Sequence, residues 1–227
     1  MNIEFEITED GSHTLFVPEL NEHYHSTHGA IQESMHVFID AGLRHCTKSE
    51  INVLEIGFGT ALNAFLTLLE AEKTSKKVDF TSLELYPLSK DDAGKLNYAE
   101  LTDPSKKNGF KKLHEVEWEK WNQITLYFSL LKMQVDFSNP SDFHPENKFD
   151  VIFFDAFAPE KQPEMWTQEI FDKIYTVSSE NAILTTYCAK GIVRRMLQTA
   201  GFVAERLPGP PGKREILRAI KKNKPLV

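Results

Sequence analysis

Between residues 51 and 200, short apolar segments alternate with segments of helical periodicity. This pattern predicts strands at 51–56, 78–84, 125–137, 149–154 and 182–187, and helices at 60–72, 89–101, 163–178 and 191–200. Alternating strands and helices form a mostly parallel sheet with helices on both faces. Residues 202–206 and 215–220 flank a turn-rich segment and are expected to close the sheet as an antiparallel pair. The sequence therefore predicts an α/β fold.

The residues before this alternation have a pattern of their own. Residues 3–17 alternate in polarity around Asp10-Gly11, which predicts a β-hairpin. Residues 29–43 place Ile31, Met35 and Phe38 at helical spacing, which predicts an amphipathic helix. We therefore expect an N-terminal hairpin and helix extension at 1–45, followed by the main domain at 46–227.

Cysteine content and hydropathy exclude several classes of protein. Cys46 and Cys188 are too few for a secreted disulfide framework, so we expect reduced thiols and a cytoplasmic protein. The N-terminus lacks the pattern of a signal peptide, and no apolar stretch approaches the roughly 20 residues of a membrane helix. We expect no metal site, because no cysteine stands at zinc-site spacing from the histidines near the N-terminus: His13, His23, His25, His28 and His36.

Charge is distributed unevenly along the chain. The net charge of −7 argues against a general nucleic-acid binder. Residues 189–227, however, carry ten basic residues against only Glu205 and Glu215. A basic end on an acidic body can place a polyanion on one face, or it can be a solvated helix face with a basic tail. Both interpretations remain open on charge alone.

The segment from Val53 to Asn63 is a buried strand, a glycine turn and the start of a helix. Gly57 and Gly59 let the backbone bend tightly and approach a ligand, with Glu55 beside the turn. A dinucleotide-binding loop needs a third glycine, but Leu62 occupies that position. The ammonium, sulfonium and ribose diol of S-adenosylmethionine favour nearby carboxylates, so this cofactor fits better.

Two further carboxylates end strands on the same predicted edge. Glu84 ends the second strand, 25 residues after Gly59, where an acid can accept hydrogen bonds from ribose hydroxyls. Asp136 ends the next long strand, where it can accept from an adenine amino group with Phe137 over the ring. Asp136 can equally be a turn residue before Ser138-Asn139-Pro140.

Asp155 closes the buried strand 149–154 and opens a proline-containing loop. A charge at such a position is costly unless it has a partner or a function. We expect its carboxylate to accept an N–H from a substrate amine, with a loop carbonyl near residues 156–158 accepting another. The nitrogen lone pair is then aimed at the methyl group. Because a carboxylate also favours the ammonium form, Asp155 must take a proton as well.

The motifs at these positions resemble a known family. The loop from Glu55 to Asn63 is similar to the Glu-Ser-Gly-Phe-Gly-Thr-Gly-Leu-Asn loop of the methyltransferase module of MnmC, which also occurs as the stand-alone enzyme MnmD. Asp155-Ala156-Phe157-Ala158-Pro159, with Lys161, Pro163, Met165 and Trp166, resembles the Asp-Gly-Phe-Ala-Pro-x-Lys-x-Pro-x-Met-Trp signature of that family. Similar blocks lie at 24–34, 193–195 and 212–215. Ala61 replaces a family glycine, and Asp136 lacks the preceding glycine.

The resemblance implies a Rossmann-like class I methyltransferase fold and S-adenosylmethionine as cofactor. It implies methylation of 5-aminomethyluridine, often 2-thiolated, at the wobble position of tRNA. The fused members carry an oxidase domain, for which we expect no room in this chain, so another enzyme must supply the aminomethyl precursor. The resemblance adds cofactor-binding residues to those named above: Tyr24, Glu33, Thr60 and Asn63.

The implied tRNA substrate suggests a role for the basic C-terminal segment. Four residues are expected to hold phosphates of the anticodon stem-loop: Arg194, Arg195, Lys213 and Arg214. In the loop after Asp155, Pro159 and Lys161 are expected at the substrate, and Phe157 or Trp166 can stack on the splayed base or belong to the core.

Two alternatives remain. One is a methyltransferase or aminopropyltransferase for a small amine such as a polyamine, which needs no basic face. The other is a non-catalytic scaffold, against which Glu55, Glu84 and Asp155 argue.

Overall fold

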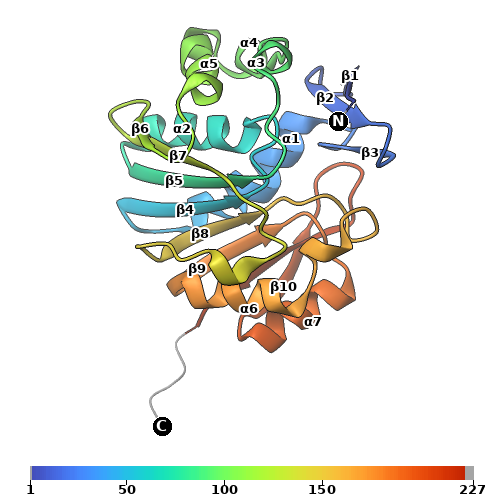
Figure 1. Cartoon of the computed structure of the whole chain (residues 1–227), viewed down its shortest axis with the longest axis vertical. Coiled ribbons are helices and arrows are strands. Elements are labelled where there is room, and N and C mark those ends of the chain that lie inside the picture. The colour runs from blue at the N-terminus through green and yellow to red at the C-terminus, as the bar shows by residue number, and fades with distance from the viewer. Residues whose placement is uncertain (1, 223–227) are drawn as a thin grey trace.

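The computed structural model describes residues 2–222, so Lys224 of the basic tail lies outside the described residues. An eight-stranded sheet with the order β10-β11-β9-β8-β4-β5-β7-β6 forms its centre (Figure 1). Neighbouring strands are parallel from β9 through β8, β4 and β5 to β7, whereas β6 and β11 are antiparallel to their neighbours. The predicted α/β fold and its antiparallel C-terminal pair are confirmed. The strands are β4 (Glu50–Ile56), β5 (Lys77–Glu84), β6 (Trp121–Gln123), β7 (Phe128–Gln134), β8 (Phe149–Phe154), β9 (Ser178–Thr186), β10 (Val203–Pro208) and β11 (Glu215–Ile220).

The two faces of the sheet bury separate clusters of side chains. Val53 and Phe153 face the layer of α2 (Leu62–Thr74) and α5 (Lys107–Glu115). Leu54 and Phe154 face the layer of α6 (Gln168–Val177) and α7 (Gly191–Ala200). Side chains alternate between the faces along each strand, so these segments are buried on both sides and appear as continuous apolar runs in the sequence.

Four predicted elements differ from the structure, and one helix was missed. The helix expected at 163–178 starts with a 3-10 turn at Pro163–Met165 and continues as α6 from Gln168, and the strand expected at 182–187 begins earlier, at Ser178. The expected helix 89–101 is divided into α3 (Lys90–Ala93) and α4 (Tyr98–Thr102). Between them, the Asn97 side chain bonds the backbone of Gly11 and His13 at 2.9 and 2.8 Å, which ties this segment to the N-terminal hairpin. The expected strand 125–137 is shorter, because residues 125–128 turn back to pair β6 with β7. Helix α5 and the 3-10 turn before it, at Pro104–Lys106, were not predicted.

The N-terminal extension has its own three-stranded sheet of β1 (Glu4–Ile7), β2 (His13–Val17) and β3 (Glu22–His23). The predicted helix is present as α1 (Ala30–Ser34), followed by a π-helical turn at Met35–Asp40 and a 3-10 turn at Leu43–His45. Phe38 packs on Phe153 of β8 with ring centroids 5.2 Å apart. Since the extension shares a core with the main sheet, the proposed boundary at residue 45 marks a change of sheet within one packed body.

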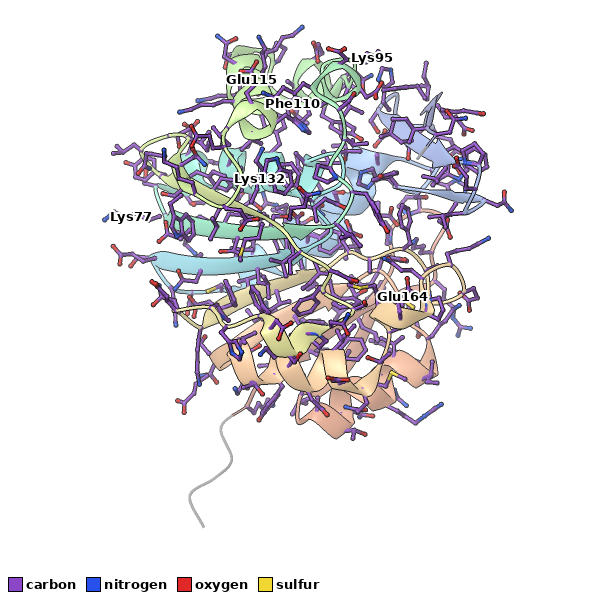
Figure 2. The ribbon with its side chains drawn as sticks, viewed as in Figure 1. Lys77, Lys95, Phe110, Glu115, Lys132 and Glu164 are labelled. Atoms are coloured by element: carbon purple, nitrogen blue, oxygen red, sulfur yellow. The ribbon has the colours of Figure 1, made fainter. Side chains whose placement is uncertain are left out.

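Lys132 of β7 is fully buried between the sheet and α5, whereas Lys77 at the start of the neighbouring strand β5 projects into solvent (Figure 2). Its ammonium donates to the His114 carbonyl at 3.0 Å and lies 4.8 Å from the ring centroid of Trp118. Loss of hydration lowers the pKa of Lys132 to about 8. No helix among residues 2–222 is long and apolar enough to span a bilayer.

Candidate active site

The glycine turn after β4 depends on two residues without side chains. Gly57 has φ +98°, and a Cβ there would lie 2.7 Å from the Asp155 carbonyl oxygen. Gly59 has φ +47°, and a Cβ there would lie 3.1 Å from the Tyr24 ring. The Gly59 N–H donates to Glu84 Oε2 at 2.9 Å. The turn therefore brings the ends of β4, β5 and β8 together around the space above it.

Ala61, where the resembling family has glycine, adopts the left-handed conformation with φ 60°. This conformation costs an L-residue about 1–2 kcal/mol. The Ala61 methyl is fully buried, and burying one methyl contributes roughly 0.8 kcal/mol. Burial of the side chain therefore offsets much of the backbone strain and explains how the turn accommodates alanine.

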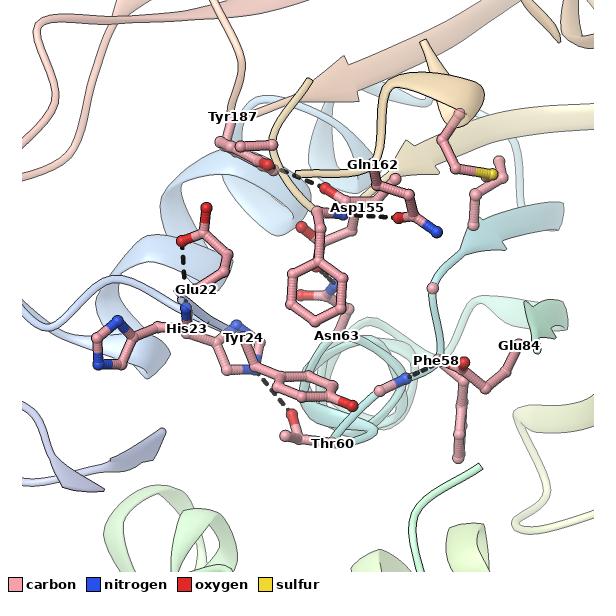
Figure 3. A pocket seen from close by; sticks show the side chains of 18 of the residues that line it. Glu22, His23, Tyr24, Phe58, Thr60, Asn63, Glu84, Asp155, Gln162 and Tyr187 are labelled. Carbon is pink, nitrogen blue, oxygen red and sulfur yellow. Dashed lines mark hydrogen bonds between the residues drawn. The ribbon is translucent and has the colours of Figure 1, made fainter. Parts of the chain in front are cut away.

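A cavity of about 430 Å³ opens at the carboxyl ends of the parallel strands (Figure 3). Its volume falls in the range of small-molecule sites, roughly 300–1,000 Å³. Of the residues predicted from the sequence, these line it: Tyr24, Glu33, Gly57, Gly59, Thr60, Asn63, Glu84, Asp136, Asp155, Phe157 and Lys213. The others do not: Glu55, Pro159, Lys161, Trp166, Arg194, Arg195 and Arg214.

Glu84 and Asp136 border one end of the cavity. Both oxygens of Glu84 accept backbone N–H groups, from Gly59 at 2.9 Å and from Tyr86 at 2.8 Å, so the carboxylate is held in a fixed position. Asp136 is exposed, and its Oδ1 accepts from the Ser138 N–H at 2.9 Å, the bond of a turn aspartate. Asp136 is therefore a turn residue and also lines the cavity. Its contact with adenine stays a prediction.

Asp155 lines the cavity and is partly exposed there. Its Oδ2 accepts from Asn63 Nδ2 at 2.9 Å, which leaves Oδ1 free of protein donors. Burial raises the pKa of Asp155 to about 7, although the Asn63 bond acts in the opposite direction. A carboxylate with this pKa is a stronger base than an ordinary aspartate and can accept a proton near neutral pH.

Glu55 lies beneath the cavity and is fully buried. One oxygen accepts from the Ser82 hydroxyl at 2.5 Å, and burial raises the pKa of Glu55 well above its ordinary value. Its position argues against the direct cofactor contact expected from the sequence. Glu55 instead borders Asn63 from below. It can therefore influence the site only indirectly, through Asn63, which bonds Asp155.

The loop after Asp155 is fixed by bonds to its own carbonyls. The Trp166 indole N–H donates to the Phe157 carbonyl at 2.7 Å, and the Tyr187 hydroxyl donates to the Ala156 carbonyl at 2.9 Å. Trp166 is 5% exposed and packs on Phe154, which places it in the core alternative rather than on a base. The loop carbonyls expected to accept from the amine therefore already have donors, and only their remaining lone pairs face a ligand.

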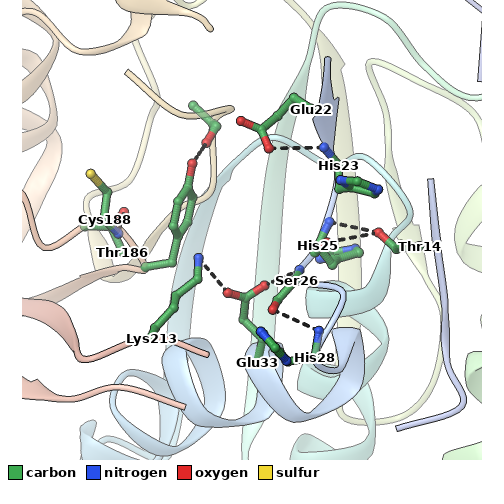
Figure 4. A network of polar contacts seen from close by, with 12 residues as sticks. Thr14, Glu22, His23, His25, Ser26, His28, Glu33, Thr186, Cys188 and Lys213 are labelled. Carbon is green, nitrogen blue, oxygen red and sulfur yellow. Dashed lines mark hydrogen bonds and ion pairs between the residues drawn. The ribbon is translucent and has the colours of Figure 1, made fainter. Parts of the chain in front are cut away.

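The N-terminal segment forms the wall opposite Asp155. The Tyr24 ring meets Phe157 edge-on at 5.1 Å, and His25 bonds the Thr60 hydroxyl at 2.8 Å. Burial lowers the pKa of His25 to about 4, so this histidine is neutral at neutral pH. Glu33 holds the segment by accepting from the Ser26 N–H at 2.8 Å (Figure 4).

Lys213 lies in this wall and not on an outer basic face. Its Nζ is 2.8 Å from Glu33 Oε1 and 4.0 Å from the ring centroid of Tyr187. The place of Lys213 in the cavity wall, beside a carboxylate, argues against the expectation that Lys213 binds phosphates. Arg195 and Arg214 are exposed, and Pro159, Lys161 and Arg194 are half-buried, outside the cavity.

Sequence reasoning missed Gln162, Tyr187 and Glu22 as cavity residues. Tyr187 directly follows β9, so the rule that ligands bind at the carboxyl ends of parallel strands could have found it. Gln162 accepts from the Phe157 N–H at 3.3 Å and lacks any sequence signal besides its place in the loop.

The cavity wall contains buried acceptors that form no hydrogen bond of good geometry with a described donor, although Lys213 Nζ lies 2.8 Å from Glu33 Oε1. Glu33 Oε1 and Asn63 Oδ1 have no hydrogen-bond partner. Such atoms are costly to bury unless a ligand supplies donors. A cofactor with an ammonium and ribose hydroxyls supplies them, so the wall fits S-adenosylmethionine. Within residues 2–222, no group of three or more His, Cys, Asp or Glu side chains is arranged to hold a metal ion.

Residues 102–222 match the model of a family described as S-adenosyl-L-methionine-dependent methyltransferase. The chain belongs to this family. The MnmC bifunctional protein of tRNA 5-methylaminomethyl-2-thiouridine biosynthesis from Hydrogenovibrio crunogenus is 32% identical over 175 residues, covering 74% of this methyltransferase and 26% of the relative. The corresponding protein from Leptospira borgpetersenii is 31% identical over 222 residues, covering 89% and 32%. The methyltransferase thus spans about a quarter to a third of the length of these relatives.

Solved structures show the same architecture. MNMC2 from Aquifex aeolicus superposes on this methyltransferase with a TM-score of 0.79 at 26% identity, covering 100% of this chain and 73% of that one. Spermidine synthase from Thermotoga maritima superposes with a TM-score of 0.56 at 15% identity, covering 100% and 81%, a likeness of fold alone.

Proposed function

We propose that this methyltransferase methylates the 5-aminomethyl group of uridine or 2-thiouridine at the wobble position of tRNA, giving the 5-methylaminomethyl product. The names of its MnmC relatives and its similarity to MNMC2 support the substrate. The observation that carries the proposal is Asp155, a carboxylate in the cavity wall whose Oδ1 accepts no hydrogen bond from residues 2–222. A reaction on cytoplasmic tRNA also agrees with the reduced state expected of Cys46 and Cys188.

Residues at one end of the cavity would hold the adenosyl part of the cofactor. Glu84, fixed by two backbone N–H groups, would accept from the ribose hydroxyls, and Asp136 would accept from the adenine amino group. Gly57 and Gly59 allow the ligand to approach the backbone closely, with Tyr24 above the turn. S-adenosylmethionine supplies an electrophilic methyl group carried on a sulfonium.

Asp155 would position the amine and accept a proton from its ammonium form. Its free Oδ1 accepts an N–H of the amine, while Asn63 keeps the carboxylate from rotating. With a pKa near 7, Asp155 takes a proton from the incoming ammonium and so uncovers the nitrogen lone pair. The charge that develops on nitrogen during methylation is stabilised by the same carboxylate once that proton has left for solvent.

The tRNA would be held outside the cavity by cations that face solvent. Arg195 on α7 and Arg214 on the loop before β11 are exposed, and Arg194 on α7 and Lys161 on the loop after Asp155 are half-buried. These groups would contact anticodon-stem phosphates, while the wobble base enters over Phe157. Lys190 pairs with Glu160, so it contributes less free charge to this face.

The direct test supplies purified protein with methyl-labelled S-adenosylmethionine and tRNA that carries 5-aminomethyluridine. We expect label in 5-methylaminomethyluridine after nucleoside analysis. Matched controls are the same tRNA without the aminomethyl group and a polyamine such as spermidine. Labelling of the polyamine but not of the tRNA would establish the small-amine alternative. Asp155→Ala should abolish labelling while cofactor binding persists, and normal methylation by this variant would refute the role of Asp155.

A further inference from the structure

An ion pair closes the end of the cavity opposite Glu84. Lys213 precedes β11, and its ammonium meets Glu33 Oε1 of α1 at 2.8 Å (Figure 4). In the sheet order, Glu84 ends β5 and Tyr187, which Lys213 covers, follows β9 three strands away. Neighbouring strands lie about 4.8 Å apart, so this end is roughly 14 Å from the strand that carries the ribose-binding candidate. The distance suits the two ends of one elongated ligand.

Both side chains of this ion pair lie in the cavity wall, and not all of their hydrogen-bonding groups have partners. The Glu33 side chain is 9% exposed, and its Oε2 accepts from the Ser26 N–H at 2.8 Å. Oε1 faces Lys213 but forms no hydrogen bond of good geometry with it or with any other described donor. The Lys213 ammonium forms no hydrogen bond of good geometry with the described residues and lies over the face of the Tyr187 ring. The wall thus offers a cavity ligand one acceptor and one cationic donor, side by side.

We infer that Lys213 and Glu33 bind the amino-acid end of S-adenosylmethionine, Lys213 its carboxylate and Glu33 its ammonium, and that Lys213 selects the carboxylated cofactor against decarboxylated S-adenosylmethionine. A zwitterion carries both charges at adjacent positions, which is the arrangement that a neutral pair of opposite charges complements. The decarboxylated molecule would leave the half-buried ammonium of Lys213 with Glu33 as its one anionic partner, a carboxylate that the ligand ammonium also engages. This inference rests on the cofactor of the proposed function and is independent of the tRNA substrate.

The position of Glu33 distinguishes this role from phosphate binding. A phosphate that approached Lys213 would also approach the Glu33 carboxylate and would be repelled by it, whereas a zwitterion brings its own ammonium to that carboxylate. Lys213 would also distinguish a methyl donor from an aminopropyl donor, because the two cofactors differ in the carboxylate that Lys213 binds. Lys213 is thus a specificity-determining residue of the cofactor site.

The experiment measures dissociation constants by calorimetry for S-adenosylmethionine and its decarboxylated form, without any methyl acceptor. Wild-type protein should prefer the carboxylated form by about ten- to hundredfold, the range of one charge-assisted bond. Lys213→Met should reduce this preference to within about threefold by weakening only the carboxylated ligand. Glu33→Gln should weaken both ligands, because both carry the ammonium.

The matched control is Lys77→Met, which removes an exposed ion pair between Lys77 and Glu50 at the amino ends of β5 and β4, away from the cavity (Figure 2). This variant should keep the wild-type preference. Lys213→Gln provides a second variant with a smaller change in shape, and thermal unfolding verifies that each protein is folded.

Two results would overturn the inference. One is equal affinity of the wild-type protein for both ligands. The other is a preference that survives in a folded Lys213 variant, which would make the ion pair a structural link between α1 and the C-terminal loop. Failure of the proposed function gives a different result: the preference for the carboxylated cofactor is present and depends on Lys213, yet tRNA with 5-aminomethyluridine is not methylated.

Discussion

The carbonyl group of Asp155 occupies the space that a side chain on Gly57 would need, since a Cβ at Gly57 would lie 2.7 Å from the Asp155 oxygen. Two parts of the site that are nearly one hundred positions apart in the sequence therefore depend on one close approach. The turn proposed to approach the cofactor and the carboxylate proposed to orient the amine are positioned against each other.

Gly57→Ala should damage both parts. Alanine at φ +98° is strained, and its methyl must displace the Asp155 backbone, so we expect a loss of about 2–4 kcal/mol in the free energy of unfolding. Cofactor affinity should fall at least tenfold by calorimetry. Gly109→Ala is the control: its Cβ would meet only Leu68, at 4.0 Å, and alanine favours helix α5, which predicts a gain of roughly 0.5–1 kcal/mol. Unchanged affinity in a folded Gly57→Ala protein would contradict the coupling.

Asp155→Asn should change how stability depends on pH. The folded-state pKa of Asp155 is raised from 3.8 to about 7, so the folded protein binds this proton more tightly than the unfolded chain. That contribution is complete below about pH 4 and is lost as pH rises through 7. The variant, whose amide oxygen can still accept from Asn63, should match wild type near pH 4.5 and exceed it at pH 8.5 by on the order of 2 kcal/mol in denaturant titrations.

The same pKa predicts a pH profile of activity. Methyl transfer, measured as kcat/KM for tRNA, should increase as pH rises through about 7, because only the ionised carboxylate accepts the proton of the amine. Asn63→Ala removes the neutral donor that lowers this pKa, and the inflection should move to higher pH. A profile that is flat between pH 6 and 8 in wild-type protein would show that Asp155 does not carry the proton.

Trp166→Phe tests whether the loop after Asp155 depends on the hydrogen bond from the Trp166 indole. The substitution keeps an aromatic ring against Phe154 but removes the 2.7 Å bond to the Phe157 carbonyl. We expect a loss of roughly 1–2 kcal/mol in stability and a larger relative loss in kcat/KM for tRNA than in cofactor affinity. Calorimetry and single-turnover methylation measure the two effects separately. An equal loss of both would indicate that the loop also supports the cofactor.

Reversing the charges of Arg195 and Arg214 to glutamate should weaken tRNA binding without changing the cofactor dissociation constant. Both side chains are exposed outside the cavity. Each lost phosphate contact should reduce the slope of log affinity against log salt by about 1. Lys222→Glu introduces the same change in charge just after β11, by the amino ends of the parallel strands and away from the cavity. This variant should have little effect on tRNA binding. Equal weakening by Lys222→Glu would point to nonspecific attraction.

Local patterns predicted most of the fold because the strands of a sheet buried on both faces appear as apolar runs. β4, β5 and β8 lie within one residue of their predicted ends. Interruptions caused by distant partners were not predictable: α3 ends at Ala93 and α4 begins at Tyr98, and between them the Asn97 side chain bonds the N-terminal hairpin. Edge strand β6 has three residues, too few for a periodic signal.

The candidate site followed the same rule. Gly57, Glu84 and Asp155 each end a strand, so the topology brings them together and their neighbourhood in space follows from the fold class. The direction of a loop side chain has no such regularity. Lys213 was grouped with Arg214 by charge, although Lys213 points into the cavity and Arg214 is exposed. Trp166 was grouped with Phe157 by aromaticity, although its burial assigns it to the core.

The cavity wall that Glu33 and Lys213 share has a consequence for synthesis on the ribosome. These residues are separated by most of the chain, and Lys213 is in place only when β11 has inserted between β10 and β9. A nascent chain that already contains the glycine turn and Asp155 still lacks one side of the cavity until these last strands emerge from the exit tunnel. If Lys213 and Glu33 bind the cofactor as we infer, we therefore expect high cofactor affinity to arise only after β11 has joined the sheet.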